Sequence, residues 1–174
     1  MVKTIRFLRH AARQKDADAL SPEGKVQAED TGRTLPTDFA FIFVSPAQRA
    51  AETVAWLLRG SGQKLPPHAV VPVLASELED RWRTAAKTAG SSRIDAILVV
   101  DPDLVKGEAE RMRRGVEELF GRLPEGARGL AVGHSPLIEA AVYGLTGVVL
   151  EPLAECDGPI VARTDQGEYR IGAP

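Results

Sequence analysis

The stretch TIRFLRHAARQ, residues 4–14, holds the features from which both the fold and a site can be argued. Its first residues are mostly apolar or β-branched, which is typical of a buried strand. The run ends on Arg9 and His10, two side chains that are seldom buried without a partner. Such a pair at a strand end is often only a solvated surface feature, but it also suits an anion-binding site, and the rest of the sequence has to decide.

Length and composition are those of one ordinary globular domain, expected over residues 1–174. Apolar residues make up 44% and charged residues 26% of the chain, and the formal net charge is −2. A charge so close to zero gives no basic field, so nucleic acid is not an expected partner. Cys156 is the single cysteine, which excludes an intrachain disulfide and a zinc site built on cysteines.

The N-terminal segment lacks the uninterrupted apolar core of a signal peptide, because Arg6 and Arg9 lie within it. No apolar run approaches the roughly 20 residues that cross a bilayer. We therefore expect a cytoplasmic protein without a membrane partner.

Strand patterns alternate with helical patterns along the chain. Strands are expected at residues 3–8, 39–44, 69–73, 129–132 and 159–162, and helices at residues 21–34, 48–59, 108–123 and 135–145. Residues 95–100 (DAILVV) fit either a strand or a buried helix, and residues 159–171 read as a hairpin around Asp165, Gln166 and Gly167. This order predicts an α/β fold, a three-layer α/β/α sandwich with a mainly parallel, mixed central sheet.

Three of the expected strands end in polar motifs, and ligands of open α/β sheets bind beyond the carboxyl ends of the strands. The first ends in Arg9 and His10. The second runs into SPAQRAAET, residues 45–53, with Arg49 in the first turn of a helix, and a later strand runs into GHSP, which contains His134. Each motif also has a simple structural interpretation as a helix cap or a solvated loop. Two of the three histidines nevertheless fall at strand ends, whereas His68 lies in a proline-rich loop and is expected to be exposed.

Together these residue types suit phosphoryl chemistry. Arginine guanidinium groups match phosphate oxygens with two parallel donors, and helix N-termini favour anions. Of two neighbouring imidazoles, one can attack phosphorus while the other donates to the developing charge. The arginines and a protonated histidine supply the positive charge, so this chemistry needs no metal.

Four motifs in order, LRHAA (8–12), LSPEGKVQAE (20–29), SPAQRAAET (45–53) and VGHSP (132–136), resemble the histidine phosphatase superfamily, whose fold is phosphoglycerate mutase-like. The resemblance covers nearly the whole chain and extends to KGEAERMRRGVEEL, residues 106–119. Each motif alone is weak, and the four in this order are specific.

The resemblance implies a role for each matched residue. His10 is the expected phosphate-accepting nucleophile, Arg9, Arg49 and His134 bind the phosphoryl oxygens, and His134 is protonated. The family's general acid is expected in LASELEDRW, residues 74–82, where Glu77 is the first choice and Glu79 and Asp80 are alternatives. No metal and no other cofactor are implied, and the partner is a phosphorylated substrate.

The sequence departs from the family pattern at two places. Ala11 replaces the usual glycine, which tolerates positive φ or a close ligand better than alanine does. AARQKDAD, residues 11–18, stands where the mutases carry a longer signature, and Asp16 there either contacts the pocket or, as we prefer, caps a turn.

The short chain is most similar to the compact bacterial phosphohistidine phosphatases. Imidazole leaves phosphorus more readily than an alkoxide, whose departure gains roughly 10²–10⁴-fold from a positioned acid. An uncertain acid therefore favours protein phosphohistidine as the substrate. The alternatives are a small-molecule phosphomonoesterase or phosphoglycerate mutase-like enzyme, and a catalytically idle phosphate-binding or interaction module on the same fold.

Overall fold

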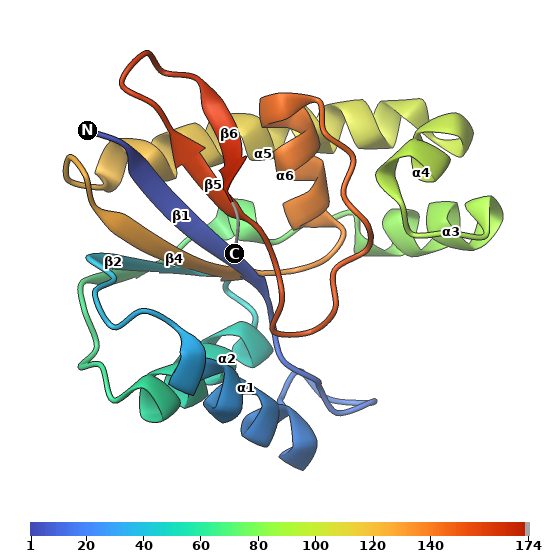
Figure 1. The fold of residues 1–174 in the computed structure, drawn as a ribbon. Helices are drawn as coiled ribbons and strands as arrows, with labels where there is room; N and C mark the ends of the chain where they lie inside the picture. Colours follow the sequence, from blue (N-terminus) through green and yellow to red (C-terminus); the bar gives the residue numbers. More distant parts are fainter. Residues whose placement is uncertain (173–174) are drawn as a thin grey trace.

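Strand β1 (Lys3–Arg9) lies inside a six-stranded sheet in the computed structural model, which describes residues 1–172 (Figure 1). The strand order is β3-β2-β4-β1-β5-β6. The other strands are β2 (Phe41–Val44), β3 (His68–Val70), β4 (Arg128–Gly133), β5 (Ile160–Arg163) and β6 (Tyr169–Gly172). Strands β1 to β4 pair in parallel, and β5 runs antiparallel to β1 and β6. The expected mainly parallel, mixed sheet is confirmed, and the last two residues of the expected domain lie outside the described part.

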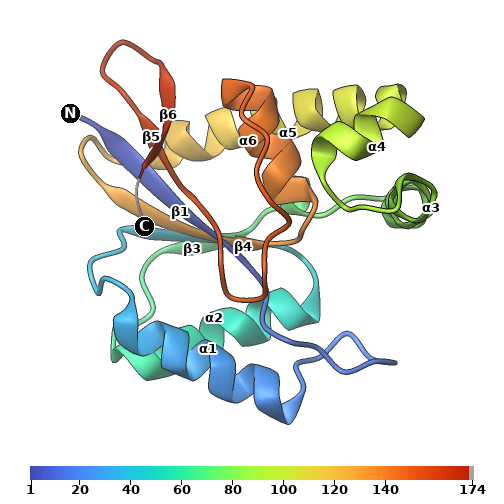
Figure 2. The ribbon, with the colours of Figure 1, turned by 45° about the vertical axis from the view of Figure 1, so that its right-hand side comes forward.

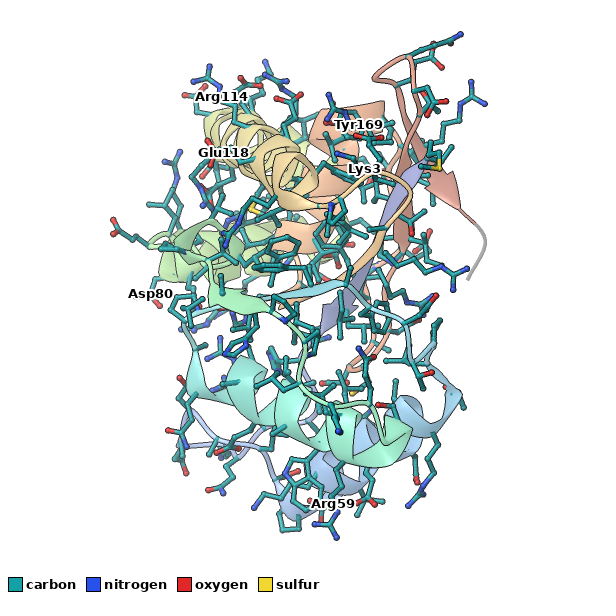
Figure 3. The ribbon with its side chains drawn as sticks, turned by 90° about the vertical axis from the view of Figure 1, so that its left-hand side faces the viewer. Lys3, Arg59, Asp80, Arg114, Glu118 and Tyr169 are labelled. Atoms are coloured by element: carbon teal, nitrogen blue, oxygen red, sulfur yellow. The ribbon has the colours of Figure 1, made fainter. Side chains whose placement is uncertain are left out.

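Helices cover both faces of this sheet (Figure 2). Helices α1 (Pro22–Thr34) and α2 (Gln48–Ser61) lie on one face, and α5 (Pro102–Arg122) and α6 (Leu137–Thr146) lie on the other. Side chains of β1 alternate between the two cores, with Ile5 and Phe7 in one cluster and Leu8 in the other. Charged side chains such as Arg59 and Glu118 lie on the outer helix surfaces (Figure 3). The expected three-layer arrangement is therefore present.

The first turn of α1 packs directly against the loop that follows His10. Ser21 caps this helix by accepting a hydrogen bond from the Gly24 amide at 3.1 Å, and Pro22 occupies the first turn, as the sequence indicated. A Cβ atom at Gly24 would lie 1.9 Å from the carbonyl oxygen of Ala12. Glycine at this position therefore allows the close approach that sets the path of the loop.

Two short helices, α3 (Glu79–Ala89) and α4 (Ile94–Val100), lie beside the sheet next to α5 and α6 (Figure 1). The sequence analysis assigned no helix to α3, and α4 resolves the ambiguous residues 95–100 as a helix. Helix α5 begins six residues before its expected start, because the Asp101 side chain caps it by accepting from the Leu104 amide at 3.2 Å.

The expected strand at residues 69–73 is wrong in its second half. Strand β3 ends at Val70, and Pro72 begins the 3₁₀ helix η1 (Pro72–Leu74). Proline lacks the amide donor that a further ladder bond requires, which explains the early end of the strand. The other strand boundaries move by one or two residues, and Gly167 occupies the turn of the expected β5–β6 hairpin with φ of 83°. Within residues 1–172, no helix has the length and apolar character to cross a membrane.

Candidate active site

The register of three parallel strands brings the motifs of the sequence together. Arg9 of β1 pairs with Gly133 of β4, so the next residues, His10 and His134, lie side by side. The backbone amide of His10 donates to the Gly133 carbonyl at 3.0 Å, and the two imidazole ring centres are 5.3 Å apart. Ser45 follows β2 and donates its amide to the Val132 carbonyl at 3.0 Å. These contacts place both histidines at one edge of the sheet.

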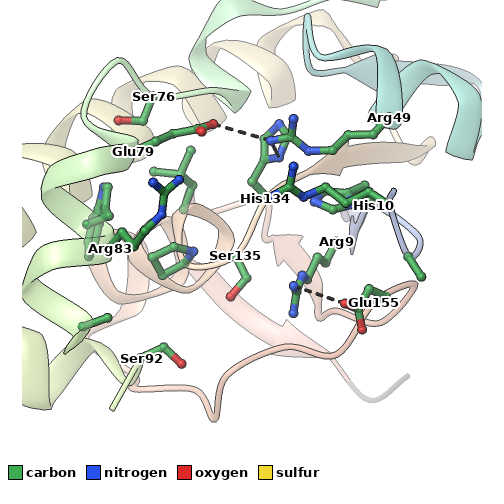
Figure 4. A pocket seen from close by; sticks show the side chains of 16 residues that line it. Arg9, His10, Arg49, Ser76, Glu79, Arg83, Ser92, His134, Ser135 and Glu155 are labelled. Carbon is green, nitrogen blue, oxygen red and sulfur yellow. Dashed lines mark hydrogen bonds and ion pairs between the residues drawn. The ribbon is translucent and has the colours of Figure 1, made fainter. Parts of the chain in front are cut away.

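A cavity of about 360 Å³ opens beyond these strand ends (Figure 4). Its lining contains both histidines together with arginines, carboxylates and a small apolar wall. The charged and histidine members are Arg9, His10, Arg13, Arg49, Glu79, Arg83, His134 and Glu155, and the apolar wall includes Trp82, Ala86, Pro136 and Leu137. Four arginines against two carboxylates make the cavity suitable for an anion.

His10 is held as a neutral imidazole with one free nitrogen. Its Nδ1 lies 2.7 Å from the carbonyl oxygen of Ala11, which can only accept, so we place the proton on Nδ1. The pKa of His10 is lowered to about 4, mainly by burial and also by the charges of Arg49 and Arg9, against the Ala11 hydrogen bond, which raises it. The lone pair of Nε2 is therefore available at neutral pH.

His134 contacts a partner through each of its ring nitrogens. Nδ1 accepts from Nη2 of Arg49 at 3.0 Å, and Nε2 lies 2.6 Å from Oγ of Ser45. Burial and the neighbouring Arg49 lower the pKa of His134 to about 3. These contacts and the lowered pKa are those of a neutral His134, because a second positive charge beside Arg49 is unfavourable. The protonated His134 that the resemblance implies for the reaction stays a prediction.

Arg49 extends from the first turn of α2 into the cavity and contacts carboxylates on two sides. Its Nη1 donates to Asp18 at 2.8 Å, and its Nη2 lies 3.5 Å from Oε1 of Glu79. Asp18 also accepts from the backbone amide of Gln48 at 2.9 Å, so it caps α2 from a distant loop. Burial raises the pKa of Asp18, but the hydrogen bonds from Arg49 and the α2 backbone outweigh burial, and the net pKa is lowered.

Arg9 is held by the segment of residues 147–159, which follows α6 and has no helix or strand. Its Nη1 donates to the Leu153 carbonyl at 2.7 Å, and its Nη2 lies 3.3 Å from Oε1 of Glu155 (Figure 4). These contacts fix the guanidinium of Arg9, which is among the groups that line the cavity.

The three candidate acids occupy different places. Glu79 lines the cavity from the first turn of α3, with its carboxylate toward Arg49 (Figure 4). Glu77 is exposed and is not among the cavity-lining residues, and Asp80 is exposed and pairs with Arg83 at 2.9 Å. Of the three, Glu79 is therefore the carboxylate that the structure brings to the two histidines.

Ala11 fits its position without the special backbone of a glycine. Among the described residues, the positions with positive φ do not include Ala11. Its side chain is fully buried with Leu8 and Leu20, and its amide donates to Oγ1 of Thr53 at 3.0 Å. The alanine therefore adds a packed methyl group beneath the site.

Sequence reasoning missed several contacts at this site, among them those of Asp18 and Ser45. Asp18, two residues after the Asp16 that was considered, is the carboxylate that binds Arg49. Ser45 was assigned only as a helix start, but its hydroxyl contacts His134. Within residues 1–172, no group of three or more His, Cys, Asp or Glu side chains is placed to hold a metal ion.

The sequence matches one known protein family. A sequence model described as the histidine phosphatase superfamily (branch 1) matches residues 6–159. A search of curated protein sequences gave no match.

Solved structures with similar folds are enzymes of phosphoryl transfer and hydrolysis. A phosphoglycerate mutase from Bacillus anthracis superposes with a TM-score of 0.74 at 18% identity, covering 99% of this chain and 92% of that one. A putative α-ribazole-5′-P phosphatase from Escherichia coli gives 0.66 at 16% identity, covering 98% and 95%. A phosphoserine phosphatase from Entamoeba histolytica, in complex with 3-phosphoglyceric acid, gives 0.62 at 15% identity, with coverage of 98% and 95%. At these identities the likeness shows the phosphoglycerate mutase-like fold.

Proposed function

The chain belongs to the histidine phosphatase superfamily, and from this membership we propose that it is a metal-independent phosphatase that forms a phosphohistidine on His10. The observation that carries the proposal is the convergence of four residues on one cavity: Arg9, His10, Arg49 and His134. Family membership supports a phosphorylated substrate and a phosphatase or mutase reaction. The hydrolytic assignment and the residue roles are our proposal.

In the first step, Nε2 of His10 attacks the phosphorus atom. A new N–P bond forms as the bond between phosphorus and the leaving group breaks, and the leaving group keeps that electron pair. Arg9 and Arg49 bind the non-bridging oxygens, whose charge they neutralise during transfer. The proton stays on Nδ1, which donates a hydrogen bond to the Ala11 carbonyl oxygen, and this contact stabilises the positive charge of the phosphorylated ring.

In the second step, water attacks the phosphorus of phosphohistidine and the N–P bond breaks. The electron pair returns to Nε2 of His10, and inorganic phosphate leaves the cavity. For an oxygen leaving group, Glu79 must enter the first step protonated. It gives this proton to the leaving oxygen, and the carboxylate that results accepts a proton from water in the second step. This exchange returns every group to its starting state.

His134 acquires its charge when the substrate binds. A phosphoryl dianion brings two negative charges next to Arg49 and His134, and opposite charge raises the pKa of an imidazole. A proton on His134 can then be donated to a phosphoryl oxygen. The low pKa of about 3 in this structure reflects burial beside Arg49, and the incoming anion offsets both effects.

We propose protein phosphohistidine as the substrate. Imidazole leaves phosphorus without strong acid assistance, and the candidate acid Glu79 is an exposed carboxylate that pairs with Arg49. The apolar side of the cavity, with Trp82 and Leu137, suits a flat ring such as imidazole. A small phosphomonoester is the second candidate, favoured by the presence of Glu79 in the cavity, since ester cleavage benefits from an acid.

A substrate panel tests the choice. Initial rates are measured on a histidine-phosphorylated carrier protein, phosphoserine and 3-phosphoglycerate, each with and without EDTA. We expect the highest kcat/KM on the phosphohistidine protein and no effect of EDTA. Rapid turnover of an ester with none on phosphohistidine would overturn the substrate assignment, and loss of activity in EDTA would contradict the metal-free mechanism. Phosphate binding without turnover of any substrate would favour the idle module.

A further inference from the structure

Glu139 is a buried carboxylate that the proposed reaction does not use. It lies in the first turn of α6, and only 1% of its surface is exposed. Burial raises the pKa of Glu139, although hydrogen bonds from Ser135 and the Leu153 backbone oppose the rise. Its neighbours Ile138 and Ala140 are buried apolar residues. A carboxylate is costly in such surroundings unless its hydrogen bonds compensate, so packing alone does not explain it.

The hydrogen bonds of Glu139 connect two parts of the site. Its Oε1 accepts from the hydroxyl of Ser135, the residue after His134, and from the backbone amide of Leu153 at 2.9 Å. Its Oε2 has no hydrogen-bond partner among the described residues. One oxygen atom therefore joins the turn after β4 to the segment of residues 147–159.

The same segment holds Arg9. The amide of Leu153 donates to Glu139 while its carbonyl oxygen accepts from Nη1 of Arg9 at 2.7 Å. Leu153 thus links Glu139 to the guanidinium of Arg9 through its own backbone amide and carbonyl groups. Because this segment has no helix or strand, side-chain anchors of this kind fix its backbone.

We propose that Glu139 is a positioning residue that orients Arg9 through the Leu153 backbone and fixes Ser135 beside His134. The inference rests on the proposed function in assigning Arg9 to the phosphoryl group. Its structural part, the dependence of Arg9 on Glu139, can be tested without any catalysis.

The test compares Glu139→Ala with Glu139→Gln, since glutamine keeps an acceptor oxygen for Ser135 and Leu153. Glu118→Ala, an exposed site on α5, is the control for loss of a carboxylate. The first readout is the side-chain Nε–H NMR resonance of Arg9, assigned with Arg9→Lys. We expect this resonance to move or broaden in Glu139→Ala and to keep its position in Glu139→Gln and Glu118→Ala. An unchanged resonance in Glu139→Ala would overturn the inference.

The second readout is vanadate binding by calorimetry, in a double-mutant cycle with Arg9→Ala. We expect Glu139→Ala to weaken binding about 10-fold alone and less than about 2-fold in the Arg9→Ala background, as coupled residues do. Equal losses in both backgrounds would mean that Glu139 acts independently of Arg9. Failure of the wild-type protein to bind vanadate would contradict the proposed function, while the Arg9 resonance still decides the role of Glu139. If Glu139→Ala does not fold, Glu139→Leu replaces it.

Discussion

The guanidinium of Arg49 donates from Nη2 to Nδ1 of His134 across 3.0 Å. Because arginine can only donate, Nδ1 of His134 carries no proton, and the remaining proton of the neutral ring lies on Nε2, toward Ser45. His134 is thus held from two sides in one tautomer and orientation. The electrophilic side of the proposed reaction is therefore organised by the fold before a phosphoryl group enters.

Replacing Arg49 with alanine removes both a phosphate contact and the partner of His134. We expect kcat/KM to fall by about 10²-fold or more, because charge-assisted contacts to a transferring phosphoryl group are among the strongest in such sites. Arg49→Lys keeps the charge but lacks the two parallel donors of the guanidinium, so part of the decrease in kcat/KM should remain. Steady-state kinetics on the preferred substrate measure both variants, and full activity of Arg49→Ala would contradict the assigned site.

Ser45→Ala tests the other contact of His134. The hydroxyl of Ser45 is buried and lies 2.6 Å from Nε2, so its removal leaves one ring nitrogen without its partner. We expect a decrease of about 10-fold in kcat/KM, the order expected for loss of one buried hydrogen bond. Ser61→Ala, at the far end of α2, is the matched control and should retain wild-type rates. Equal rates for the two variants would exclude a role of Ser45 in orienting His134.

Glu79→Gln and Glu77→Gln distinguish the candidate acids. We expect Glu79→Gln to slow hydrolysis of a phosphoester by about 10²-fold, the lower end of general acid catalysis, and to slow phosphohistidine hydrolysis much less. Glu77→Gln, whose side chain lies outside the cavity lining, should change neither rate. The reverse pattern would assign the acid to Glu77, as the sequence resemblance first suggested.

The stability of the protein should decrease as the pH falls from 7 to 5. His10 and His134 have pKa values lowered from 6.5 to about 4 and about 3, so the unfolded chain binds protons over this range while the folded chain does not. Above pH 6.5 both histidines are neutral in the folded and the unfolded chain, and the protein has its full stability. As the pH decreases from 6.5 toward the folded pKa values, the free energy of unfolding falls. By linkage each histidine contributes about 2 kcal/mol to the difference between pH 7 and pH 5.

Urea unfolding at the two pH values measures this difference. In His10→Asn the dependence on pH should be roughly halved, because one of the two buried imidazoles is gone. Equal pH dependence in the wild-type protein and in His10→Asn would show that His10 is not buried in its neutral form.

The sequence predicted those parts of the fold that are set by local pattern. Val, Ile, Leu and Phe runs indicated the strands, and Ser21-Pro22 indicated the start of α1. Helix α3 was not predicted because its sequence is polar with few apolar positions, and its apolar side, with Trp82 and Ala85, becomes evident only when packed. The early end of β3 depends on Pro72, which is visible in the sequence and cannot donate a ladder hydrogen bond.

The sequence likewise predicted those residues of the site that lie next to strands. Arg9, His10 and His134 lie at strand ends, and Arg49 lies in the first turn of the helix after β2, so the register of the sheet brings them together. Asp18, Glu139 and the Leu153 carbonyl lie far from these residues along the chain, and their contacts depend on loop paths that no local pattern encodes. The choice between Glu77 and Glu79 depended on the start of helix α3, which was not anticipated: Glu79 is its first residue and Glu77 precedes it.

The central claim is that His10 accepts the phosphoryl group, and a phosphoenzyme trap tests it most directly. The protein is incubated with a labelled phosphodonor, quenched within milliseconds to seconds, and the modified residue is located by mass spectrometry under alkaline conditions. We predict an acid-labile phosphoramidate on His10 that is absent from His10→Ala and retained in His68→Ala. A label on another residue, or rapid turnover without any label on His10, would contradict the mechanism.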